Sequence, residues 1–178
     1  FRSIWLKADL AADNTTGLLT PLVKLDGETD GASVALVVTD PEGYAVYEGP
    51  AAGDTIEIEG IQPWSHAAPV LYHAVLTLRD ADGVLQEVVP YDIGFRRFEM
   101  INGVMCLNGE RVVFNGVNRH EWNADRGRAI GADDMHAAMA VFKKNNINAV
   151  RTCHYPNQSL WYDLCDRNGI YMIDETNL

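Results

Sequence analysis

Short apolar runs, rich in β-branched and aromatic residues, recur along the first half of the chain and are separated by turn-forming residues. Seven runs have the length and character of strands: Ile4–Leu10, Leu18–Leu25, Ser33–Thr39, Tyr44–Glu48, Thr55–Glu59, Leu71–Arg79 and Leu85–Phe95. Residues 55–59 alternate strictly between polar and apolar, which indicates one buried and one solvated face. Because no helical period interrupts these runs, we predict an all-β, immunoglobulin-like sandwich.

The hydrophobic period changes in the second half. Asn-Gly pairs at residues 102–103 and 108–109 predict hairpin turns, and apolar residues at 135, 138, 139 and 142 then mark one face of a helix. The predicted elements are, in order, a strand at Val112–Val117, this helix, a strand at Ile147–Arg151, a helix at Asn157–Arg167 ending before Gly169, and a strand at Ile170–Asp174. This order predicts a parallel sheet covered by helices. Such a sheet buries both faces, so we expect further strands outside this stretch.

Charge is distributed unevenly along the chain. The 178 residues have a net charge of −11, and residues 1–95 contain 15 acidic and four basic residues, whereas residues 96–178 contain ten of each. The shift predicts two domains, at 1–95 and 96–178, although a single domain with one acidic face is an alternative. The negative charge argues against nucleic acid or an anionic membrane as the main partner, and no apolar run is long enough to cross a bilayer.

The cysteines and the first residues indicate the cellular setting. The chain has three cysteines without CxxC spacing, which disfavours a disulfide framework or a closed zinc site and favours reduced thiols in the cytoplasm. The sequence starts at Phe1, inside a predicted strand, without a signal segment. We therefore expect it to be a piece of a longer cytoplasmic protein.

Polar runs follow all three strands of the predicted parallel sheet. They are Asn118–Glu121, Arg151–Asn157 and Asp174–Asn177. In parallel α/β folds the functional groups gather where strands end, so these runs are expected to surround one site. Imidazole, guanidinium, carboxylate and amide groups all bond hydroxyls, and aromatic rings cover the apolar faces of a pyranose. The sequence therefore favours a sugar-binding site.

Other chemistries are open to the same residues. His120, Cys153 and His154 are a conceivable metal site, but a sequential Cys-His pair rarely suits tetrahedral zinc. Cys153 with His154 as its base is disfavoured, since adjacent side chains on an extended segment point apart. Glu121 and Glu175 are the first candidates for the carboxylate pair of a retaining glycosidase, which needs a separation of about 5–5.5 Å.

Several of these motifs resemble a known family. The run from Asn148 to Glu175, which includes Arg-Thr-Cys-His-Tyr-Pro-Asn at 151–157, resembles the signature of family 2 glycoside hydrolases. Residues 94–97 and 108–121 are similar to the start of that family's barrel, and residues 63–72 to the last part of its sandwich domain. The Asn-Arg-His-Glu-Trp-Asn form at 118–123 is most similar to the large bacterial β-galactosidases.

The resemblance implies an immunoglobulin-like sandwich followed by about three β/α units of a (β/α)₈ TIM barrel. It implies hydrolysis of terminal β-galactosides with retention, by acid/base and nucleophile glutamates that lie after Leu178. This overrules the pairing of Glu121 with Glu175 and leaves supporting roles here. By resemblance, His120 and His154 bind the sugar and stabilise the transition state, Arg151 lies beside the nucleophile and Asp174 orders the site.

Further candidates at the same edge are Asn118, Glu121, Glu175 and Asn177. The resemblance also implies Mg²⁺, with Na⁺ as an additional option, in the whole enzyme, and no metal site within this chain. We expect the whole enzyme to be a homo-oligomer and the chain alone to self-associate through its open sheet. The alternatives are a β-glucuronidase or β-mannosidase relative, and a non-catalytic carbohydrate-binding or scaffold module.

Overall fold

The computed structural model describes residues 1–27 and 29–177, which form two compact units. The first unit comprises Phe1–Trp64 and Val70–Arg111, and the second comprises Ser65–Pro69 and Val112–Leu178. The sequence places a boundary between residues 95 and 96, whereas the contacts assign the following hairpin to the first unit. The reason is Arg97, whose Nη1 donates to the carbonyl of Ala11 at 2.5 Å and whose own carbonyl accepts from the N–H of Asn108 at 2.8 Å.

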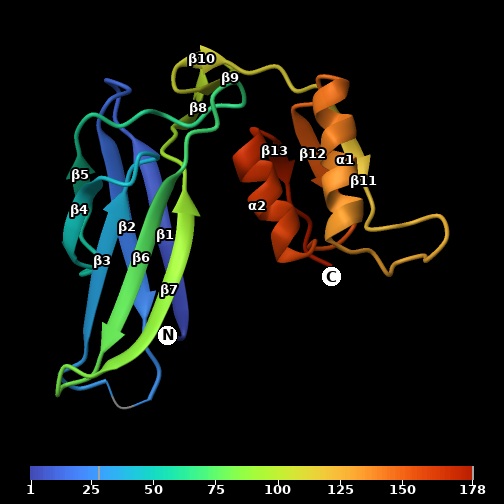
Figure 1. The fold of residues 1–178 in the computed structure, drawn as a ribbon. Coiled ribbons are helices and arrows are strands. Elements are labelled where there is room, and N and C mark those ends of the chain that lie inside the picture. Colours follow the sequence, from blue (N-terminus) through green and yellow to red (C-terminus); the bar gives the residue numbers. More distant parts are fainter. Residues whose placement is uncertain (28, 178) are drawn as a thin grey trace. The chain divides into compact units, whose positions relative to one another are not determined.

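Two antiparallel sheets make up the larger part of the first unit (Figure 1). One sheet has the order β1-β2-β5 and the other β4-β3-β6-β7. Their strands are β1 (Ser3–Leu10), β2 (Gly17–Lys24), β3 (Ser33–Thr39), β4 (Ala45–Pro50), β5 (Ile56–Ile58), β6 (Tyr72–Arg79) and β7 (Leu85–Ile93). All seven predicted strands are therefore confirmed, with ends shifted by a few residues.

The core of this unit lies between the two sheets. Leu19 from one sheet and Leu36 and Leu76 from the other are completely buried in one apolar cluster, together with Phe95. Gly17 allows this packing, because a Cβ at that position would lie 2.8 Å from the ring of Phe95. Side chains that alternate inward and outward thus hold the sheets face to face.

A small hairpin sheet follows, with the order β10-β9-β8. Its strands are β8 (Phe98–Ile101), β9 (Val104–Leu107) and β10 (Glu110–Arg111). Asn102 and Gly103 have φ of 51° and 80°, and Asn108 and Gly109 have φ of 54° and 87°. Positive φ at both turn positions is what an Asn-Gly hairpin turn requires, so both predicted turns are confirmed.

The second unit is a parallel three-stranded sheet with two helices. Its elements are β11 (Gly116–Arg119), α1 (Ala132–Lys144), β12 (Ala149–Thr152), α2 (Ser159–Asn168) and β13 (Tyr171–Ile173), and the sheet order is β11-β12-β13 (Figure 1). Met135, Met139 and Phe142 of α1 are buried with Trp161 of α2, and Gly169 ends α2 in the left-handed conformation with φ of 70°. Neither helix of the described residues has the length and apolar character needed to cross a membrane.

The strand expected at Val112–Val117 is wrong in its first part. β11 begins only at Gly116, and Val113 and Phe114 are exposed. The side chain of Asn148 explains the difference, since its Nδ2 donates to the carbonyl of Val113 at 2.8 Å and its Oδ1 accepts from the N–H of Asn115 at 2.7 Å. Side-chain bonds thereby replace the backbone ladder of a strand over these residues.

Candidate active site

The parallel register places the polar runs at one edge of the sheet. Asn118 of β11 pairs with Arg151 of β12, and Arg151 pairs with Ile173 of β13. The residues that follow these strands therefore emerge side by side, as expected for a parallel sheet. All site residues discussed below belong to the second unit.

Arg151, His154 and Glu175 form a connected polar cluster at this edge. Nε and Nη2 of Arg151 lie 2.6 and 2.5 Å from Oε1 of Glu175, and Nδ1 of His154 lies 2.9 Å from Oε2. These contacts hold the pKa of Glu175 below its ordinary value, chiefly through the bond with His154 and then through Arg151. Glu175 therefore remains an ionised acceptor that orients both neighbours.

Asp174 is bonded on its other side. Its Oδ1 accepts hydrogen bonds from Oγ1 of Thr152 at 3.0 Å and from the hydroxyl of Tyr162 at 2.9 Å. Oγ1 of Thr152 also accepts the backbone N–H of Glu175 at 2.9 Å. Burial raises the pKa of Tyr162, and the bond to Asp174 raises it further, so the phenol stays a donor. Asp174 thus anchors the end of β13 to β12 and α2.

Arg119 and Glu121 connect the loops that follow β11 and β12. The guanidinium carbon of Arg119 lies 3.7 Å from the ring centre of Trp161, and its Nη1 donates to Oδ1 of Asn157 at 2.6 Å. Glu121 lies 3.7 Å from the same Nη1 and accepts the N–H of Gln158 at 3.0 Å. Burial lowers the pKa of Arg119, although the guanidinium stays charged.

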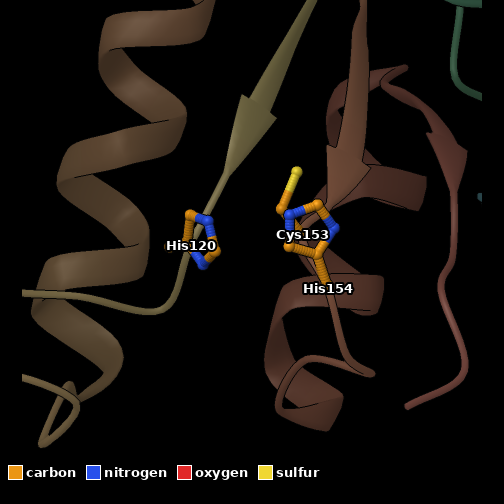
Figure 2. A group of neighbouring side chains, drawn as sticks. All are labelled: His120, Cys153 and His154. Atoms are coloured by element: carbon orange, nitrogen blue, oxygen red, sulfur yellow. The ribbon is translucent and has the colours of Figure 1, made fainter. Parts of the chain in front are cut away.

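The two histidines face each other at the exposed surface of the edge. The rings of His120 and His154 meet edge to face with centroids 5.5 Å apart, and Nδ1 of His120 lies 3.4 Å from the hydroxyl of Tyr155. Figure 2 shows both rings beside the buried Cys153. The expectation that the side chains of Cys153 and His154 point apart is wrong, since their ligand atoms lie within 4.8 Å of each other. The segment is a turn, closed by the N–H of Tyr155 and the carbonyl of Thr152 at 3.2 Å.

Of the remaining candidates, Asn118 belongs to the cluster, with Oδ1 3.4 Å from Nη1 of Arg151. Asn177 is exposed beyond the end of β13. Glu121 and Glu175 are each paired with a different arginine, so neither is a free carboxylate. Thr152 was not among the residues predicted from the sequence. It is completely buried and forms hydrogen bonds with Asp174 and with the backbone of Glu175. The one sequence signal for Thr152 was its position between two predicted site residues.

The exposed surface of this edge therefore offers two imidazoles, while the carboxylates and guanidinium groups behind them are already paired. Imidazole nitrogens both donate to and accept from hydroxyl groups. A cluster of this kind can bind a polyhydroxylated ligand and respond to charge that develops on it.

Two family models cover almost the whole chain. The model described as glycosyl hydrolases family 2 matches residues 2–96, and that described as glycosyl hydrolases family 2, TIM barrel domain, matches residues 98–178. The chain is 46% identical to a β-galactosidase of Streptococcus thermophilus, covering 99% of this chain and 18% of that protein. It is 44% identical to a β-galactosidase large subunit of Lactobacillus acidophilus, covering 97% of this chain and 28% of that protein.

Among solved structures, the chain resembles a β-glucuronidase from Ruminococcus gnavus in complex with D-glucuronic acid. The TM-score is 0.87 at 25% identity, covering 98% of this chain and 30% of that one. The 178 residues thus span between 18% and 28% of the length of the two β-galactosidases named above.

Proposed function

Because the chain belongs to family 2 of the glycosyl hydrolases, we propose that it is part of an enzyme that hydrolyses terminal β-D-galactosides with net retention. Residues 2–96 are the family's sandwich domain and residues 98–178 are the start of its TIM-barrel domain. We further propose that the sandwich is immunoglobulin-like and that β11, β12 and β13 begin about three β/α units of the barrel.

The observation that carries this proposal is the pair of histidines at the strand ends, with His154 held by the ionised Glu175. In the proposed enzyme, His120 and His154 bond the hydroxyls of the terminal sugar. These bonds strengthen as the ring flattens toward an oxocarbenium ion. Arg151 and Asp174 act as positioning residues, since Arg151 is bonded to Glu175 and Asp174 is bonded to Thr152.

A neutral sugar fits this edge better than a glucuronide. A uronic acid needs a free cation for its carboxylate, whereas Arg151 directs Nε and Nη2 to Glu175 and its Nη1 to Asn118. The resemblance to a β-glucuronidase structure makes that activity the second candidate, but its sequence identity is 25% against 46% for the β-galactosidase.

The acid and the nucleophile come from other parts of the proposed enzyme. A retaining glycosidase needs one carboxylic acid that is protonated before the reaction and one free carboxylate. Glu175 is ion-paired with a lowered pKa, and Glu121 is paired with Arg119. Neither meets these requirements, so their roles here are to position neighbouring groups.

We propose that Mg²⁺, or Na⁺, is also held elsewhere in the enzyme. Magnesium prefers carboxylate and water oxygens, but the carboxylates of Asp174 and Glu175 are already occupied by Thr152, Tyr162, Arg151 and His154. The described residues at this edge therefore do not fit a magnesium site, and no step of the reaction is assigned to the ion.

The setting of the enzyme is proposed from the cysteines and the exposed apolar residues. Cys106, Cys153 and Cys165 are free and buried, which suits a reducing compartment such as the cytoplasm. Phe98, Met100 and other apolar side chains of the β8–β9 hairpin are exposed, which favours association with other protein surfaces. We propose a homo-oligomer for the whole enzyme and self-association for this chain.

The test is the substrate choice of the full protein in which this chain occurs. We expect kcat/KM for an aryl β-galactoside to exceed that for the matching aryl β-glucuronide at least about a hundredfold, since an unpaired buried or binding-site charge costs about 3 kcal/mol or more. A preference for the glucuronide would establish the second candidate. Sugar binding without turnover of either substrate would identify a carbohydrate-binding module instead.

A further inference from the structure

Three metal-ligating side chains meet at the edge described above. A ring nitrogen of His120, a ring nitrogen of His154 and Sγ of Cys153 all lie within 4.8 Å of one another. Figure 2 shows these three side chains grouped together. They come from the ends of two neighbouring strands, β11 and β12, so the parallel sheet itself brings them together. The thiol is buried and both imidazoles are exposed.

We propose that His120, Cys153 and His154 bind a borderline-soft divalent cation, Zn²⁺ in the first place. Zinc sites with three protein ligands, which include imidazole nitrogens and thiolates, keep a fourth position open for water. Hard cations such as Mg²⁺ prefer oxygen ligands and are not expected to bind.

The three ligand atoms need to move only a short distance toward one another to bind zinc. Tetrahedral zinc with Zn–N of about 2.0–2.1 Å and Zn–S of about 2.3 Å places its ligand atoms roughly 3.3–3.6 Å apart. The thiol of Cys153 is buried at the end of β12, whereas the imidazole of His120 is exposed and the side chain of His154 is 64% exposed. Rotation of the exposed rings therefore supplies the adjustment of about 1 Å.

Neighbouring groups already orient one of these ligands. Nδ1 of His154 lies 2.9 Å from Oε2 of Glu175 and 3.3 Å from Nη2 of Arg151. In the tautomer whose Nδ1–H donates to Glu175, the free lone pair of the ring is on Nε2. A carboxylate behind a ligating histidine is the usual partner at zinc sites, where it fixes the tautomer and raises the basicity of the ligand.

The local charges are compatible with a dication. Nη1 of Arg151 donates to Sγ of Cys153 at 3.5 Å, so a cationic group already lies beside the sulfur. The same guanidinium would repel a metal ion if it were unpaired, but Glu175 neutralises it at 2.6 Å. Zinc, thiolate and two neutral imidazoles then leave a single positive charge at the site.

Zinc and sugar would exclude each other, because the same imidazoles serve both. That consequence depends on the proposed function, whereas the binding of zinc to this chain does not. Binding is therefore measured directly on the chain, without reference to activity.

The experiment titrates the reduced, metal-free 178-residue chain with Zn²⁺ by calorimetry and with Co²⁺ by absorption. We expect saturation at one ion per chain and a thiolate-to-cobalt charge-transfer band that Zn²⁺ abolishes and Mg²⁺ does not. Cys153→Ser should remove the band, and His154→Gln should weaken zinc binding at least about tenfold. His154→Gln alters an exposed side chain, so this arm holds even if the substitution at the buried cysteine impairs folding.

Matched controls are available in the same chain. Cys106→Ser and His136→Gln remove a buried thiol of β9 and an exposed imidazole of α1, and both variants should bind zinc as the unaltered chain does. Burial raises the pKa of the Cys165 thiol to about 12, so it stays protonated and gives no cobalt band. The proposal is overturned if no saturable binding occurs, if the band persists in Cys153→Ser, or if His154→Gln binds zinc with unchanged affinity.

Discussion

Replacement of Thr152 by Val removes the hydroxyl that joins β12 to the end of β13. Oγ1 of Thr152 donates to Asp174 at 3.0 Å and accepts the N–H of Glu175 at 2.9 Å, in a side chain that is completely buried. Valine has nearly the same shape, so the perturbation is the loss of these two bonds. Its direct consequence is a less fixed Glu175, and through it a less fixed His154.

The expected cost follows from the two bonds. A hydrogen bond to a charged group contributes about 1.5–3 kcal/mol, and an orphaned buried N–H costs about 1–3 kcal/mol. Asp174 keeps its bond from Tyr162, so the lower values apply, and the added methyl of valine recovers about 0.8 kcal/mol. We therefore expect the free energy of unfolding of the second unit to fall by about 2 kcal/mol, a factor of roughly 30 in the unfolding equilibrium.

Native-state hydrogen exchange of the β12 and β13 amides measures this cost without assuming one transition for the whole chain. Thr152→Ser keeps the hydroxyl and is the conservative comparison, with an expected loss below about 1 kcal/mol. Thr39→Val, on a half-buried threonine of β3, is the matched control and should leave β12 and β13 unchanged. Equal losses for Val and Ser at position 152 would refute the role assigned to the hydroxyl.

Three further predictions follow from the described residues. Limited proteolysis should cut first within residues 122–132, where Trp122 and the arginines of the loop are exposed, and prior cleavage inside the strands of residues 1–95 would contradict this. Glu175 has a lowered folded-state pKa, so its contribution to stability is present above about pH 4.3 and is lost as the pH falls through the lower folded value. Glu175→Gln should therefore make the free energy of unfolding less dependent on pH below that value, as followed by circular dichroism. An unchanged pH dependence in the variant would argue against the ion pair. The 178-residue chain alone should show no turnover of an aryl β-galactoside, and turnover that co-purifies with it would contradict this. In light scattering at on the order of tens of micromolar the chain should form at least dimers through its exposed apolar residues, and a strict monomer would contradict that expectation.

Local pattern was sufficient for the sandwich strands and for both helices. Alternation and turn residues predict strands wherever one face is buried, and the 3.6-residue period of Met135, Met139 and Phe142 predicts a helix for the same reason. The start of β11 could not be predicted this way. The carbonyl of Val113 and the N–H of Asn115 bond to the side chain of Asn148 and not to a neighbouring strand. Asn148 lies more than 30 positions away in the sequence, so a local pattern does not reveal this.

The candidate site was predictable only in outline. The rule that functional groups follow parallel strands correctly brought His120, Arg151 and His154 together. Spacing could not assign their roles, because the ion pairs that occupy Glu121 and Glu175 depend on side-chain geometry. Sγ of Cys153 lies within 4.8 Å of a ring nitrogen of both histidines because the backbone turns at this point. The sequence predicts an extended segment here, so this proximity could not be predicted from it.

The central claim is that the imidazoles at the strand ends bind the sugar, and His154→Phe in the full protein tests it most directly. We expect kcat/KM for an aryl β-galactoside to fall by on the order of 10²–10⁴-fold, since a bond that strengthens in the transition state is lost. His136→Phe, which alters an exposed histidine of α1, should retain full activity. Activity of His154→Phe within a factor of about two of the unaltered enzyme would show that His154 is structural and would contradict the assignment of this edge as the sugar site.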